Sequence, residues 1–143
     1  MTTRERSEEH KQFLTDLLIT AVEHCGYGWF TSREYEPNGE LGTAYAVIEE
    51  FDGEEWNKYH INLDTFARGL GVIRNAVPKV DERYPDDGEV LHNRKTGERL
   101  YLSSYLREDI LAADRTNGEE GDIDVVGALA VLECGLFGKV VYA

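Results

Sequence analysis

The feature that most constrains the fold of this chain is the dipeptide Asp52-Gly53, together with the residues on either side of it. Residues 43–51 before it are rich in β-branched and aromatic side chains, and in residues 55–63 after it apolar and polar side chains alternate. Asp-Gly between two such runs is a strong signal for a β-hairpin. The alternation also predicts that one face of the sheet is buried while the other faces solvent.

A third strand is expected on the N-terminal side of this hairpin. Residues 29–36 are again rich in aromatic and β-branched side chains, and the Pro-Asn-Gly at 37–39 supplies a turn. The sequence therefore predicts an antiparallel three-stranded sheet within residues 29–63.

Apolar residues at helical spacing predict four helices, over residues 8–25, 65–76, 104–115 and 125–134. The expected N-caps, in chain order, are Ser7, Asp64, Ser103 or Ser104, and Asp122 or Asp124. Gly135 is the expected stop of the fourth helix. Gly69 and Gly71 each weaken the second helix by about 1 kcal/mol relative to alanine, unless they serve close packing or a kink.

The remaining segments are expected to be less regular. Residues 77–89 hold two prolines and five acidic residues and are predicted to be a loop. Residues 89–92 are expected to pair with 98–102 as a short hairpin, and 139–142 are expected to add an edge strand. The predicted architecture is a single α+β domain over residues 7–143, with roughly four helices packed on the sheet and residues 1–6 disordered.

Charge excludes several classes of function. The chain has 143 residues, with 15 Lys and Arg against 28 Asp and Glu, and its net charge is -13. Such an excess disfavours direct binding to nucleic acid or to an anionic membrane. No apolar run approaches the ~20 residues of a membrane span, and the first residues do not resemble a signal peptide. Two cysteines make no disulfide framework, so a reducing cytoplasm is the expected compartment.

Most of the acidic residues fall in three windows, 34–55, 81–89 and 108–124, and the first window contains no Lys or Arg. On a strand, carboxylates two residues apart lie roughly 7 Å apart on one face, so Glu34/Glu36 and Glu50/Asp52/Glu54 are expected to form rows that resemble a phosphate backbone. Such rows predict binding to a basic groove. The bland alternative is that the acidity only keeps the chain soluble. The candidate partner-binding residues are Glu34, Glu36, Glu49, Glu50, Asp52, Glu54 and Glu55.

Two alternatives belong to other functional classes. A metal-dependent enzyme would use Asp86, Asp87 and His92, although the nearby nuclease-like pattern has Asn93 where an acid is required. A small-molecule or nucleotide sponge would use aromatic stacking surfaces, and its candidate residues are Trp29, Tyr35, Tyr45 and Trp56. These aromatics are more often core residues. No phosphate loop or nucleophile elbow is present, so neither catalytic residues nor cofactors are assigned.

The cysteines and one cluster of cations are further candidates for a functional site. A zinc site of His24, Cys25 and Cys134 matches no standard ligand spacing, so small buried cysteines are the expected state. Arg94, Lys95 and Arg99 make a local basic exception around the predicted turn at 93–97. Against the overall charge, they are not expected to bind DNA directly.

Three segments carry a resemblance: Cys25-Gly-Tyr-Gly-Trp-Phe30, Asp64-Thr-Phe-Ala-Arg-Gly-Leu70, and Asp122-Ile-Asp-Val with the ending Leu136-Phe-Gly-Lys-Val-Val-Tyr142. In this order they resemble small uncharacterised accessory proteins of phages, plasmids and integrated elements of high-GC bacteria. The resemblance implies no catalytic residues. It implies a host-takeover or counter-defence factor. Together with the acidic rows, it predicts a non-enzymatic protein of the host cytosol that inhibits a nucleic-acid-handling host protein or defence effector, of the anti-CRISPR or anti-restriction type, by DNA mimicry.

Overall fold

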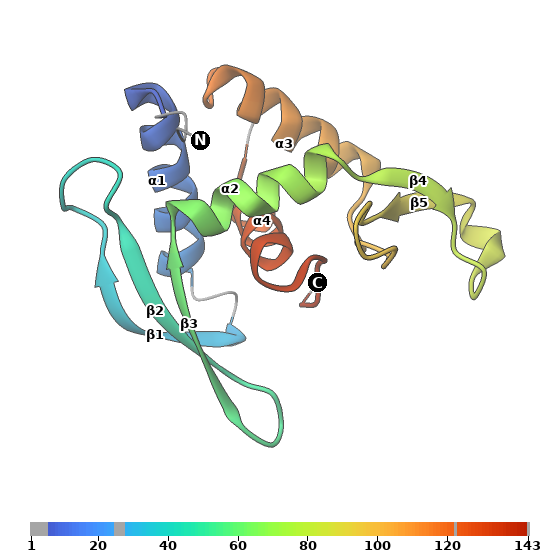
Figure 1. The fold of residues 1–143 in the computed structure, drawn as a ribbon, viewed down its shortest axis with the longest axis horizontal. Coiled ribbons are helices and arrows are strands. Elements are labelled where there is room, and N and C mark those ends of the chain that lie inside the picture. Colours follow the sequence, from blue (N-terminus) through green and yellow to red (C-terminus); the bar gives the residue numbers. More distant parts are fainter. Residues whose placement is uncertain (1–5, 25–27, 122, 143) are drawn as a thin grey trace.

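The computed structural model describes residues 6–24, 28–121 and 123–142. The elements, in chain order, are α1 (Glu8–Glu23), β1 (Phe30–Glu36), β2 (Tyr45–Phe51), β3 (Trp56–Asn62), α2 (Leu63–Arg74), β4 (Val77–Val80), a 3-10 helix (Pro85–Asp87), β5 (Glu89–His92), α3 (Ser104–Thr116) and α4 (Val125–Phe137). This arrangement confirms the α+β class, with four helices beside an antiparallel sheet (Figure 1).

The three-stranded sheet has the order β1-β2-β3 with antiparallel neighbours. Ala46, Ile48 and Ile61 are fully buried on its inner face, as the alternation in the sequence predicts. They belong to one core with the apolar residues of α1, α2 and α4. The helices therefore cover one face of the sheet and leave the other open, and the end of the β2–β3 hairpin extends away from them (Figure 1).

Helices α2 and α4 cross at backbone contact, and glycine makes this possible. A Cβ added at Gly69 would lie 1.9 Å from the carbonyl oxygen of Val131, and one added at Gly135 would lie 2.1 Å from that of Thr65. Gly69 therefore serves close packing. The prediction that Gly135 ends the fourth helix is wrong, because this glycine is needed inside α4, which ends at Gly138 in a left-handed conformation.

Side-chain caps begin the helices. Ser7, Ser103 and Asp124 each accept a backbone N–H of the first turn, as predicted. The expected cap Asp64 is wrong. The Asn62 side chain accepts the N–H groups of Asp64 and Thr65, so α2 begins immediately where β3 ends.

The segment after α2 differs from the prediction. Residues 77–89 are not all loop, because β4 pairs antiparallel with β5 from Val77↔His92 to Val80↔Glu89. Residues 98–100 do pair with the end of β5, as expected, through the bridge His92↔Arg99 and the hydrogen bonds from Asn93 N to Glu98 O and from Leu100 N to Leu91 O, at 2.7 and 2.9 Å. Proline within β4 is tolerated because this two-stranded ribbon has open edges.

The C-terminal segment does not form the predicted edge strand. Val140 N donates to Leu100 O at 2.8 Å, and the chain then turns along α4, where the Glu133 carboxylate accepts the N–H groups of Val141 and Tyr142. None of the helices in the described ranges is both long and apolar enough to span a membrane.

Candidate functional site

An exposed aromatic pair lies at the end of the β2–β3 hairpin. Phe51 and Trp56 face each other across the two strands, on the sheet face that the helices leave open. They are 51% and 62% exposed, and their rings stack with centroids 5.2 Å apart and an interplanar angle of 20°. Trp56 is among the aromatic residues singled out from the sequence, whereas Phe51, the last residue before the predicted Asp52-Gly53 turn, is not.

The turn between them, residues 52–55, is rigid and acidic. Asp52 Oδ1 accepts the backbone N–H groups of Glu54 and Glu55 at 2.9 and 2.8 Å, and Asp52 Oδ2 accepts Asn57 Nδ2 at 3.1 Å. These hydrogen bonds, the one from the Glu55 amide foremost, lower the pKa of Asp52. Asp52 is therefore ionised while it holds the turn in one conformation.

Glu54 and Glu55 add two carboxylates to the same turn. Both are exposed, and neither side chain has a bonded partner within the part of the chain that the structure describes. Together with Asp52 they place three carboxylates in the turn that joins Phe51 to Trp56. We call Phe51, Trp56 and these three acids the hairpin tip.

Glu49 and Glu50 do not belong to the exposed carboxylates. Glu49 lies between two cations, with Oε2 at 2.8 Å from Arg33 Nε and Oε1 at 3.8 Å from Lys58 Nζ. Glu50 follows Ala46 and Ile48 on the buried face. The expected row Glu50/Asp52/Glu54 therefore does not form.

Glu50 instead organises a buried polar cluster. It is 5% exposed, and it accepts Tyr59 Oη at 2.9 Å, Asn57 Nδ2 at 3.2 Å and the hydroxyl of Tyr142. Burial, with the hydrogen bond to Glu50, raises the pKa of Tyr59 to about 12. The hydrogen bond to Glu50, with burial, likewise raises that of Tyr142 to about 12. This carboxylate ties the C-terminal segment to the sheet.

Glu34 and Glu36 form a second exposed acidic group. A bulge at Arg33 shifts the β1 register, so that these residues stand opposite Val47 and Tyr45 of β2. Both are exposed, and no described residue is bonded to their side chains. They lie beside the start of β2, whereas the hairpin tip lies at its end. The ion-paired Glu49 separates the two acidic groups.

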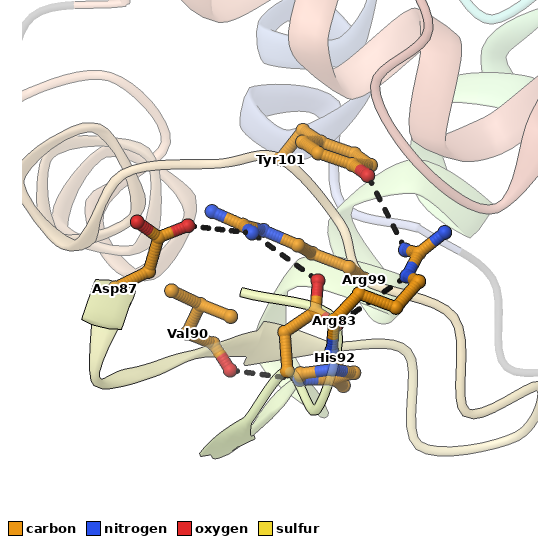
Figure 2. A network of polar contacts seen from close by, with 7 residues as sticks. Arg83, Asp87, Val90, His92, Arg99 and Tyr101 are labelled. Carbon is orange, nitrogen blue, oxygen red and sulfur yellow. Dashed lines mark hydrogen bonds and ion pairs between the residues drawn. The ribbon is translucent and has the colours of Figure 1, made fainter. Parts of the chain in front are cut away.

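The alternative metal site is not assembled. The Asp87 carboxylate lies 3.0 Å from Arg99 Nη1, and His92 is buried with Nδ1 at 2.8 Å from Val90 O (Figure 2). Asp86 is exposed, and no group of three metal-ligating side chains occurs among the described residues. The hypothesis fails there because an arginine occupies the place that a cation would take.

The aromatic residues of the sponge hypothesis do not share one surface. Trp29 stacks on Tyr142 with centroids 4.6 Å apart, and Tyr35 donates its hydroxyl to Glu23 at 3.0 Å. Both pack against the core, whereas Tyr45 and Trp56 lie on the open face.

The cysteine site finds no support in the described residues. Cys134 is buried in α4, and burial raises the pKa of its thiol to about 12, which disfavours the thiolate that zinc requires. His24 is exposed with Nδ1 at 2.8 Å from Thr20 O. Cys25 lies outside the described residues.

We compared the chain with known protein families, curated proteins and solved structures. No protein-family model, no curated protein and no solved structure matches the chain. We therefore infer the function from the residues and contacts of this chain alone.

Proposed function

We propose that this protein is a non-enzymatic binding protein whose hairpin tip inserts into a basic groove of a nucleic-acid-handling protein and thereby excludes nucleic acid. Phe51 and Trp56 fill an apolar pocket in the floor of that groove. Asp52, Glu54 and Glu55 contact the lysines and arginines around the pocket. Inhibition of a restriction or CRISPR effector is the specific form of this activity that we propose.

The observation that carries the proposal is the exposed, stacked aromatic pair beside a turn of three acidic residues, of which Glu54 and Glu55 have no bonded partner among the described residues. Large aromatic side chains dominate binding energy at protein interfaces, and tryptophan is prominent among them. The hydrogen bonds of Asp52 fix the turn in advance, which reduces the entropy lost on binding. The carboxylates supply long-range attraction to a basic surface and steer the encounter.

The positions of the exposed carboxylates favour partial occupation of a groove over mimicry of a whole DNA duplex. Glu49 is ion-paired and Glu50 is buried, so the acids on β2 make no continuous row. The tip and the Glu34/Glu36 pair remain as two separate patches. We therefore propose that the protein occupies part of a groove, with the tip as the main contact and the β1 pair as a secondary one.

The first test is affinity capture from host lysate with matched variants. Trp56→Ala and Phe51→Ala, singly and together, are compared with Tyr105→Ala, which removes an 88% exposed aromatic from α3. We expect Tyr105→Ala to retain the partner of the wild type and the tip variants to lose it. Retention of the same partner by the double variant would exclude the tip as the binding surface.

The second arm tests charge. Glu54→Lys with Glu55→Lys reverses two charges at the tip, and Glu119→Lys with Glu120→Lys makes the same change in an exposed loop after α3. Only the tip reversal should release the partner, and the wild-type complex should weaken as salt rises. Equal loss in both double variants would indicate that net charge, not the tip, governs binding.

A further inference from the structure

A small pocket lies between the C-terminal half of α2 and the turn after β5, residues 93–97. Its volume is about 340 Å³, and most of its exposed wall is carbon. Arg68, Arg94 and Lys95 line it, and no Asp or Glu does. In a chain of net charge -13, three cations without a carboxylate make a local reversal of charge.

These cations are available to a ligand. Arg94 Nε donates to Asn75 O at 3.1 Å, which fixes the side chain and leaves its two terminal NH2 groups unbonded to any described residue. The side chains of Arg68 and Lys95 likewise have no bonded partner in the described ranges. Arg74, farther along α2, is by contrast paired with Asp114 at 2.7 Å.

The turn that carries two of the cations is held rigidly. Asn93 is buried, and its Oδ1 accepts the backbone N–H groups of Lys95 and Thr96 at 2.8 and 3.2 Å. Its Nδ2 donates to Gly138 O at 2.9 Å, which ties the turn to the end of α4. The positions of Arg94 and Lys95 are therefore set before any ligand binds.

Gly71 is a second, independent sign of a site. A glycine inside a helix lowers helix stability relative to alanine, so a glycine at such a position indicates a packing or functional requirement. Gly69 has one, because it contacts the backbone of α4, but a Cβ added at Gly71 would meet nothing within 4 Å. Gly71 instead lines the pocket beside Val72, where the missing side chain leaves room.

We propose that this pocket binds a small molecule of the nucleotide class. Arg94, Arg68 and Lys95 hold its phosphate, because the planar guanidinium fork matches phosphate oxygens. The flat ring lies against Gly71 and Val72, where the wall is mostly carbon. The volume falls within the lower range of small-molecule sites. The site is separate from the hairpin tip, so either proposal can fail without the other.

The test is a titration of the isotope-labelled protein followed by backbone amide NMR signals. The probes are AMP, GMP, CMP, UMP, adenosine and inorganic phosphate. We expect saturable shifts at the amides of Gly71, Val72 and Thr96 with at least one nucleotide, and weaker effects with adenosine or phosphate alone. The absence of saturable shifts with all four nucleotides at about 10 mM would overturn the proposal.

Variants decide whether the binding is specific to the pocket. Arg94→Gln should lower the affinity by about tenfold, whereas Arg115→Gln, the same change at the exposed end of α3, should leave it unchanged. Gly71→Ala should raise the melting temperature and still weaken nucleotide binding. Equal weakening by Arg94→Gln and Arg115→Gln would show diffuse charge attraction and contradict the site.

A short single-stranded oligonucleotide separates the proposed ligand from a polymer. We expect it to bind these amides no more than about tenfold tighter than the preferred mononucleotide, because the pocket has room for one unit. Binding at the same amides that is more than about a hundredfold tighter would overturn the small-molecule proposal and assign the surface to a nucleic-acid strand.

Discussion

The β2–β3 and β4–β5 hairpins are both rich in acidic residues, but among the described residues only the turn of the second has acids paired with arginines. Asp81 accepts hydrogen bonds from Arg83 and Arg99. Asp87 is paired with Arg99 (Figure 2). No Lys or Arg occurs between Glu34 and Glu55, and the tip of the first hairpin keeps its charge exposed. The number of acids in a window therefore does not measure the negative charge that a partner meets.

The protonation chemistry differs in the same way. Burial acts to raise the pKa of Asp81, but the Arg83 amide and the guanidinium groups of Arg99 and Arg83 outweigh it, so the pKa falls. At the tip, only amide groups stabilise the Asp52 carboxylate. Arginines hold Asp81 and Asp87 of the β4–β5 hairpin, whereas Glu54 and Glu55 of the other hairpin face solvent without a bonded partner among the described residues.

The largest expected effect separates two acids of the same hairpin. Glu50→Ala should lower the free energy of unfolding by about 3 kcal/mol, because the partly buried hydrogen bonds from Asn57, Tyr59 and Tyr142 lose their shared acceptor. Glu54→Ala should change it by no more than about 0.5 kcal/mol. Urea denaturation measures both values, and similar losses in the two variants would remove the distinction between structural and presented acids.

A smaller effect is expected in the β4–β5 hairpin. Asp81→Asn should lower the melting temperature and speed hydrogen exchange in β4 and β5, because Arg83 and Arg99 lose their shared carboxylate. The folded-state pKa of Asp81 is lowered, so its stabilisation is present above the unfolded value of about 3.9 and is lost as pH falls through the folded value. Wild-type stability should fall more steeply with acid than that of the variant. Parallel pH curves would contradict the role given to Asp81.

The smallest expected effect concerns Glu133, which is buried and has no cation bonded to it among the described residues. Burial raises its pKa, against the opposing hydrogen bonds from the Tyr142 and Val141 amides. The folded form therefore binds the proton more tightly, and stability should decline as pH rises from the unfolded pKa through the folded one. Glu133→Gln keeps an acceptor for both amides and should remove this decline. An unchanged pH dependence of unfolding would show that Glu133 does not titrate in this way.

Local patterns predicted much of the fold. The three strands, the four helices and the caps Ser7, Ser103 and Asp124 follow from alternation, periodicity and short-range hydrogen bonding. The interior position of Gly135 depends on the crossing with α2, which no local pattern reveals. Strand β4 was missed because it is only four residues long and contains a proline.

The same distinction between local patterns and tertiary contacts explains why only part of the candidate site could be predicted from the sequence. Asp52, Glu54 and Glu55 lie in a turn, where exposure is the ordinary state. The inward direction of Glu50 had a signal, since it shares its parity with Ala46 and Ile48. The pairing of Asp81 with Arg99 had none, because the fold brings together residues that are far apart in the sequence.

The proposed function requires the hairpin tip to exclude nucleic acid from a partner. Displacement of labelled duplex DNA from the captured, purified partner, followed by fluorescence anisotropy, measures this exclusion. The wild type and the Glu119→Lys/Glu120→Lys variant should displace the DNA, whereas the Glu54→Lys/Glu55→Lys and Trp56→Ala variants should not. Displacement by the tip variants at wild-type concentrations would contradict the proposed function.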